Sequence, residues 1–291
     1  MGASGADIVF TSSATEAASL ALHGRGLAGA AVEHDAVRAH IEPTLPVTQD
    51  GAVTVAAPDQ STLQLSNSET GVMQELPQGI AVSDFTQAFG KVPVSFAWSG
   101  ATMALVSAHK LGGPKGVGAL IIQQGQDVEA LIQGGGQEMG RRSGTENVIG
   151  IAGFGAAAEA AQRDLETGVW SRVEEFRNIL EISLEALADP IIFIGREAPR
   201  LPNTSCFIAP GWKGETQVMQ MDLAGFAISA GSACSSGKVK ASGVLTAMGF
   251  DDAEASQAIR VSIGPATTED DIRRFAETWA SKYEKIRARA A

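Results

Sequence analysis

The chain has very little cysteine, few aromatic residues and fewer positive than negative charges. Its 291 residues include two cysteines and one tyrosine, and aromatic residues make up 5% of the total. Two cysteines cannot form a disulfide framework, and the absence of CxxC and HxxxH pairs gives no reason to expect a metal site. With 22 basic against 33 acidic residues, the formal net charge is −11, so we expect no nucleic-acid partner.

Long apolar runs are also missing. No stretch of the sequence approaches the roughly 20 consecutive apolar residues that a membrane-spanning helix needs. The first residues, Met-Gly-Ala-Ser-Gly-Ala-Asp, contain neither the basic nor the apolar region of a secretory signal. Gly90-Lys91 is followed by valine, so it does not match a phosphate-binding P-loop. These absences, with the scarcity of cysteine, favour a cytoplasmic protein without membrane contact.

Lys110 follows closely after a predicted buried strand. The apolar run at 102–106 predicts that strand, and the glycines and proline after Lys110 predict a turn before a second apolar run at 117–122. A partly desolvated lysine at a strand end can act as a Schiff-base nucleophile. The alternative is a solvated lysine in a glycine-rich hairpin. Lys115 lies inside the turn, where a fixed covalent bond to a cofactor is harder to build.

Two other strand ends carry groups suited to a charged ligand. A strand at 7–10 runs into Thr11-Ser-Ser-Ala-Thr-Glu16, and a helix that begins there offers free N–H groups to an anion. Asp84 ends a strand predicted at 79–84, where its carboxylate can pair with a positively charged group of a ligand. Helix capping is the alternative for both segments.

The two cysteines have different surroundings. Cys206 stands in the apolar run Cys-Phe-Ile, which is typical of a small buried side chain. Cys234 stands among glycine and serine, which favours an exposed loop where a thiolate can form and react.

Together these segments resemble the class V aminotransferases, the pyridoxal-phosphate (PLP) enzymes that include cysteine desulfurases. The motifs that carry the resemblance are the lysine segment 107–118, the turn 11–16, Glu33-His-Asp-Ala-Val37, Asn67-Ser-Glu-Thr-Gly71, the loop 134–147 and Gly231-Ser-Ala-Cys-Ser-Ser-Gly237. The resemblance implies an α/β fold of fold-type I, with a large PLP-binding domain over 1–167 that has a mainly parallel sheet between helices. A smaller C-terminal α/β domain over 168–291 would carry the catalytic cysteine loop.

The resemblance also implies roles for individual residues. Lys110 would bind the cofactor covalently, His34 would stack on its ring, and Arg260 would clamp the substrate carboxylate. Cys234, Lys110 and His34 are thus the candidate catalytic residues. Contacts with PLP are implied for Ala14, Thr15, His34, Asn67, Ser68, Asp84, Gln87, Ser107, His109, Lys110 and Thr145.

Departures from the family's usual motifs occur at a few of these positions. Ser13 replaces a glycine, Ser68 replaces an asparagine and Met139 replaces an arginine. Thr145 would reach the phosphate of a neighbouring subunit, which implies a homodimer.

The activity implied is that of a cysteine desulfurase, a sulfurtransferase that converts L-cysteine to L-alanine and forms a persulfide on Cys234. The sulfur would pass to an acceptor such as an iron–sulfur scaffold protein, for iron–sulfur cluster assembly or tRNA thiolation. A selenocysteine lyase or a cysteine sulfinate-type relative would use the same residues. An inactive truncated paralogue is a further alternative, because the strand at Asp7 leaves no room for the family's usual N-terminal segment, which lines the substrate pocket. We therefore expect either that the gene product starts further upstream or that this chain binds the cofactor weakly and turns over slowly.

Overall fold

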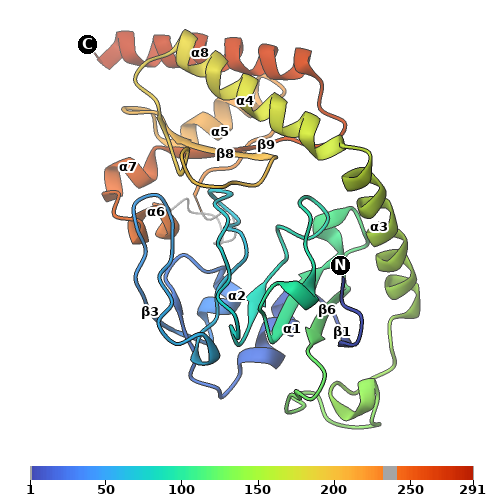
Figure 1. Cartoon of the computed structure of the whole chain (residues 1–291). Helices are drawn as coiled ribbons and strands as arrows, with labels where there is room; N and C mark the ends of the chain where they lie inside the picture. Colours follow the sequence, from blue (N-terminus) through green and yellow to red (C-terminus); the bar gives the residue numbers. More distant parts are fainter. Residues whose placement is uncertain (1, 232–240, 291) are drawn as a thin grey trace. The chain divides into compact units, whose positions relative to one another are not determined.

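The chain divides into two compact units. The computed structural model in Figure 1 describes residues 2–231 and 241–290. Unit 1 comprises Met1–Pro46, Val53–Asn67 and Gln74–Thr167, and unit 2 comprises Val47–Ala52, Ser68–Met73 and Gly168–Ala291. No helix among the described residues is both long enough and apolar enough to cross a membrane.

Unit 1 is built on a four-stranded mixed sheet with the order β1-β6-β5-β4. These strands are β1 (Asp7–Thr11), β4 (Ser83–Asp84), β5 (Met103–Ser107) and β6 (Gly118–Ile122). The two apolar runs of the lysine segment form the β5–β6 antiparallel hairpin, so this sequence prediction is confirmed. β1 pairs antiparallel with β6, and β4 pairs parallel with β5.

Helices cover both faces of this sheet. Every residue of β5 is buried, and alternate residues face opposite sides. Leu105 packs in a cluster with Ala18 and Leu22 of α1 (Ala14–Leu22), whereas Val106 packs in a cluster with Phe154 of α3 (Val148–Glu166). A strand buried on both faces explains why the sequence of β5 is continuously apolar.

The continuous sheet is smaller and less parallel than the sequence predicts. The apolar segment 53–56 forms no strand. The apolar segment 63–65 makes hydrogen bonds such as Leu63 N–H to the Val82 carbonyl (3.1 Å), beside an isolated parallel bridge at Thr62, but it forms no regular strand either. The predicted strand at 79–84 shortens to β4. Turns at Pro58 and Gly79 bound these segments closely, so only one or two residues of each can pair.

Shorter elements complete unit 1. They are β2 (Ala28–Ala30) and β3 (Glu42–Leu45), which pair in parallel, α2 (Asp35–Arg38), and the 3₁₀ turns η1 (Pro58–Gln60), η2 (Phe96–Trp98), η3 (Ala108–Leu111) and η4 (Glu138–Gly140).

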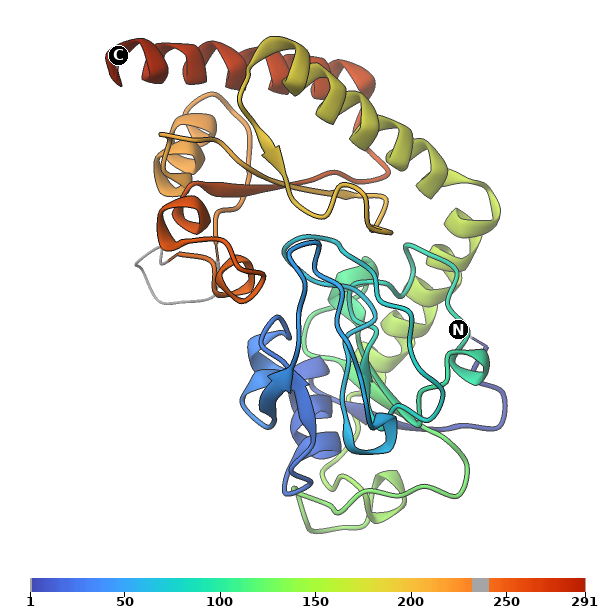
Figure 2. The ribbon, with the colours of Figure 1, turned by 60° about the vertical axis from the view of Figure 1, so that its left-hand side comes forward.

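Unit 2 contains a three-stranded antiparallel sheet, β7-β8-β9, covered by long helices. Its elements are α4 (Val169–Leu187), β7 (Ile192–Phe193), β8 (Thr204–Ile208), α5 (Gly214–Asp222), α6 (Gly243–Ala247), α7 (Asp252–Ser256), β9 (Ala258–Ser262) and α8 (Glu269–Ala290). Figures 1 and 2 both show α4 and α8 side by side. Between them and the sheet lies an aromatic core in which Trp279 contacts Phe207, Trp212 and Tyr283.

The helix α8 begins with a capping box, as the segment Thr268-Glu-Asp-Asp271 indicates. Thr268 Oγ1 accepts the Asp271 N–H (3.2 Å), and the Asp271 carboxylate accepts the Thr268 N–H (3.0 Å).

A short segment from the N-terminal half adds to the edge of unit 2. Leu201 N–H donates to the Gly71 carbonyl and Met73 N–H to the Pro199 carbonyl, both at 2.8 Å. Gly71 has φ +77°, and a Cβ there would lie 2.9 Å from the Thr204 Cβ. Only glycine allows this close approach to β8. Because the segment that contains Gly71 bonds to residues 199–201 in this way, unit 2 is not a contiguous stretch of chain.

Candidate active site

Unit 1 gathers polar residues at one edge of its sheet. Thr11 of β1, Gly118 of β6 and Ser107 of β5 lie in one register row, and Asp84 of β4 pairs with Leu105. The parallel strands β4 and β5 therefore both end at this edge, which is where open α/β sheets bind ligands.

Lys110 lies one turn beyond the end of β5. Ser107 is followed by η3, which Gly112 closes with φ 89°. Ser107 Oγ and His109 Nδ1 are 2.9 Å apart, which ties the turn to the strand end. Lys110 itself is exposed in the isolated chain. Its amine is therefore not partly desolvated there, in contrast to the expectation from the sequence.

The N-terminus of α1 lies directly against this hairpin. A Cβ on Gly118 would come within 2.6 Å of the Ser13 backbone carbon, so glycine is required for the contact. Ser13, which replaces the family's usual glycine, is the N-cap of α1, and its Oγ accepts the Glu16 N–H at 3.4 Å. The capping alternative is thus present, while the first N–H groups of the helix, at Ala14 and Thr15, have no intrahelical acceptors.

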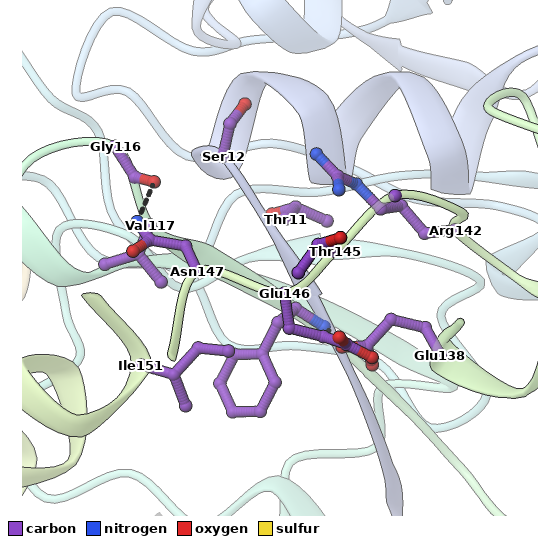
Figure 3. Close-up of a pocket in the computed structure, with 12 residues that line it drawn as sticks. Thr11, Ser12, Gly116, Val117, Glu138, Arg142, Thr145, Glu146, Asn147 and Ile151 are labelled. Carbon is purple, nitrogen blue, oxygen red and sulfur yellow. Dashed lines mark hydrogen bonds between the residues drawn. The ribbon is translucent and has the colours of Figure 1, made fainter. Parts of the chain in front are cut away.

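An ion pair fixes the loop 134–147 against this turn. The Glu16 carboxylate accepts the Ser12 N–H and the Arg142 Nε–H, both at 2.7 Å. Burial raises the pKa of Glu16, but the hydrogen bonds from Arg142 and Ser12 outweigh it and lower the pKa overall. The loop and the turn enclose a pocket of about 100 Å³, and Figure 3 shows Thr145 and Arg142 facing Thr11 and Ser12 across it.

Asp84 lies within the electrostatic reach of two basic residues. Its carboxylate accepts the Thr86 N–H at 2.8 Å. Burial raises the pKa of Asp84, while that hydrogen bond and the electrostatic effects of His34 and Lys110 act in the opposite direction. His34 N-caps α2, because its Nδ1 accepts the Ala36 N–H at 3.1 Å, so the neutral ring carries its proton on Nε2.

Two buried polar residues support this side of the site. Asn67 donates through Nδ2 to the Val32 carbonyl at 2.9 Å and thereby holds the strand end before His34. Glu33 is 2% exposed and accepts the Gln64 N–H at 2.7 Å. Burial, with a smaller effect from Asp84, raises the pKa of Glu33 to about 8.

Arg260 and Ser68 belong to unit 2. Arg260 Nη1 donates to the Ser68 carbonyl at 2.8 Å and Nη2 to Ser229 Oγ at 3.1 Å. The Arg260 Nε atom is buried and has no hydrogen-bond partner among the described residues.

The two cysteines fall in different parts of the chain. Cys206 is buried in β8, as its apolar neighbours predict, and burial raises the pKa of its thiol. Cys234 lies outside the described residues.

The structure brings most of the expected cofactor contacts together in unit 1. Its members at or beside the sheet edge are Ala14, Thr15, His34, Asn67, Asp84, Gln87, Ser107, His109 and Lys110, with Thr145 on the adjoining pocket. Sequence reasoning missed the roles of Glu33 and Arg142. Glu33 and Arg142 stand inside quoted motifs, but a local motif carries no signal of burial or of an ion pair between distant segments.

Comparisons with known proteins identify the family of the chain. Residues 60–275 match the family model described as aminotransferase class-V. The chain is 35% identical to a cysteine desulfurase of Cereibacter sphaeroides, over 97% of the chain and 81% of that protein. It is 34% identical to cysteine desulfurase IscS 1 of Archaeoglobus fulgidus, over 98% of the chain and 83% of that protein.

Solved structures give the same result. The structure of a NifS-like protein from Rickettsia africae superposes with a TM-score of 0.84 at 28% identity, covering 96% of this chain and 82% of that one. The chain therefore belongs to the class V aminotransferase family and is a homologue of the cysteine desulfurases.

Proposed function

We propose that the chain is a PLP-dependent cysteine desulfurase that converts L-cysteine to L-alanine and takes the sulfur onto Cys234. The observation that carries the proposal is the placement of Lys110 and Asp84 at the ends of adjacent strands, with His34 close enough to act on Asp84. Its relatives named cysteine desulfurase, and a family that depends on PLP, support this assignment.

The residues at the sheet edge fit PLP. The N–H groups that begin α1 suit the phosphate, and the exposed amine of Lys110 suits the aldehyde. Asp84 would face the ring nitrogen, whose positive charge would favour the ionised carboxylate that burial alone disfavours. When bound, PLP supplies an electron sink for the substrate carbon.

The remaining groups have roles in proton and sulfur transfer. Lys110 and His34 would move protons at the substrate carbon. Arg260 would bind the substrate carboxylate, and its unpartnered Nε offers a donor for that purpose. The Cys234 thiolate would bond to the substrate sulfur as the carbon–sulfur bond breaks, with the electron pair remaining on carbon. Alanine then leaves after protonation, and Cys234 carries the persulfide for an acceptor such as an iron–sulfur scaffold protein.

The subunit arrangement is part of the same proposal. Thr145 is exposed beside the turn that begins α1, and we propose that it contacts the phosphate site of a second copy in a homodimer.

The test is an assay of alanine and sulfide from L-cysteine with PLP and a thiol reductant. We expect equal amounts of both products, and Cys234→Ser should stop sulfide release without changing the absorption of bound PLP. Cys206→Ser is the matched control and should keep activity. Loss of activity in Cys206→Ser alone, or an inactive protein that binds PLP normally, would contradict the proposal. Comparing turnover of L-selenocysteine with that of L-cysteine tests the lyase alternative.

A further inference from the structure

Lys91 is a buried lysine next to the candidate site. Lys91 is only 8% exposed. It follows Asp84 and Gln87 on a tight turn in which the Lys91 N–H donates to the Ala88 carbonyl at 3.0 Å. Burying an ammonium group is costly unless it finds partners. Burial, and to a lesser extent the charge of Lys110, lowers the pKa of Lys91 to about 8, so the amine lies within electrostatic reach of Lys110.

Among the described residues, the hydrogen-bond acceptors of the Lys91 amine are both on Gln87. Lys91 Nζ donates to the Gln87 backbone carbonyl at 2.6 Å and to Gln87 Oε1 at 3.2 Å. An ammonium group has donors only, so the amide atom that faces it must be the oxygen. This contact places the oxygen of the Gln87 carboxamide toward Lys91, so Nε2 is the end that faces away from Lys91.

We infer that Lys91 is a positioning residue that holds the Gln87 carboxamide so that its Nε2 presents an N–H donor to the phenolic oxygen of PLP. The inference rests on the proposed function, because it assumes that PLP occupies the edge beside Asp84. Without Lys91, the amide can rotate, and its oxygen can face an oxygen of the ligand, which is repulsive.

A purely structural role is the competing explanation. The bond from Nζ to the Gln87 carbonyl closes the turn after β4, so loss of Lys91 would destabilise the protein whether or not Gln87 binds a ligand. A double-mutant cycle separates the two roles, because coupling through Gln87 is non-additive. The variants are Lys91→Met, Gln87→Ala and the pair together.

The readouts are the Kd for PLP, the absorption of bound PLP and the unfolding temperature of the PLP-free protein. We expect Lys91→Met and Gln87→Ala each to raise the Kd by about tenfold, the scale of one charge-assisted hydrogen bond. The double variant should bind PLP no more weakly than Gln87→Ala. Lys91→Arg, which keeps donors only, should stay close to the wild type.

Controls and contrary outcomes are well defined. Lys213→Met, at an exposed lysine of unit 2, should change none of the three readouts. If Lys91→Met does not fold, Lys91→Gln replaces it, because glutamine can also accept and so does not fix the amide. Additive losses of PLP affinity, or an unchanged Kd with a lowered unfolding temperature, would overturn the role of Lys91 alone. A wild-type chain that binds no PLP would overturn the proposed function as well.

Discussion

Lys110 and Lys115 are both exposed, yet only Lys110 acts electrostatically on the carboxylate at the end of β4. We therefore expect borohydride reduction in the presence of PLP to label Lys110, as peptide mapping would show. Lys110→Ala should abolish the label and Lys115→Ala should retain it. A label on Lys115 in the wild-type protein would show that the wrong lysine has been assigned.

Glu33 should make stability depend on pH. Its pKa is raised from 4.5 to about 8 in the folded state, so the folded chain holds a proton that the unfolded chain releases. The resulting stabilisation is complete below pH 4.5 and is lost as the pH rises through about 8, by roughly 5 kcal/mol at most. Glu33→Gln mimics the protonated acid, because its amide oxygen can still accept the Gln64 N–H.

The measurement is the free energy of unfolding at pH 5 and pH 8. Glu33→Gln should match the wild type at pH 5 and exceed it at pH 8. Glu175→Gln, at an exposed glutamate of α4, is the control and should show no such difference. Equal pH dependence in the wild type and Glu33→Gln would mean that Glu33 is not held protonated.

At the scale of residues, the sequence predicts strand-end groups better than buried ones. Lys110 and Asp84 could be placed because an apolar run precedes each of them and a strand has a direction. Glu33 could not, because its burial and its hydrogen bond depend on a segment that is distant in sequence, the one that carries Gln64. The contact between Arg142 and Glu16 spans 126 residues and has no local signal either.

At the scale of elements, the contact between α1 and β6 depends on one glycine, Gly118, which has no side chain. Gly118→Ala would place a Cβ 2.6 Å from the Ser13 backbone, and backbone atoms can move away only by shifting α1. We expect a loss of about 1–3 kcal/mol of stability, the usual range for overpacking, together with weaker PLP binding. Thermal unfolding and a PLP titration measure the two effects.

Gly155 provides the matched control for this substitution. It lies inside α3, and a Cβ there would meet nothing within 4 Å. Gly155→Ala should therefore be neutral or stabilise the protein by roughly 0.5–1 kcal/mol, as expected for a helix interior. If Gly118→Ala is equally harmless, the close approach of α1 to β6 is not a constraint on the site.

Helices were easier to predict than strands in this chain. The helices α3, α4 and α8 give clear sequence signals, because helices of this length repeat their apolar pattern over several turns, and α3 and α8 also begin with side-chain caps. The apolar segments at 53–56 and 63–65 form no regular strands, because they are short and contribute at most isolated bridges. The sheet expected in unit 1 was too large for the same reason.

At the scale of the whole molecule, unit 2 depends on residues far from its main stretch. A fragment of residues 168–291 would lose the bonds that Leu201 and Met73 make with Gly71 and Pro199. Each hydrogen bond contributes roughly 1 kcal/mol, so the fragment should unfold more easily than unit 2 of the full chain. Hydrogen exchange should show lost protection at the Leu201 amide, while the Ile194 amide, which donates to Cys206, stays protected longer. Equal protection of Leu201 in fragment and full chain would contradict this dependence.

The bond between Arg260 and the Ser68 carbonyl joins residues 192 positions apart, which sets an order of events on the ribosome. At a synthesis rate of about 5–20 residues per second, Ser68 emerges roughly 10–40 s before Arg260. Unit 1 ends at Thr167 and can close during that interval. The nascent chain must then keep residues 68–73 accessible as a tethered loop, with Glu69 in water although the finished protein buries it. Delays in translation between Thr167 and Arg260 would prolong the exposure of this loop to proteases.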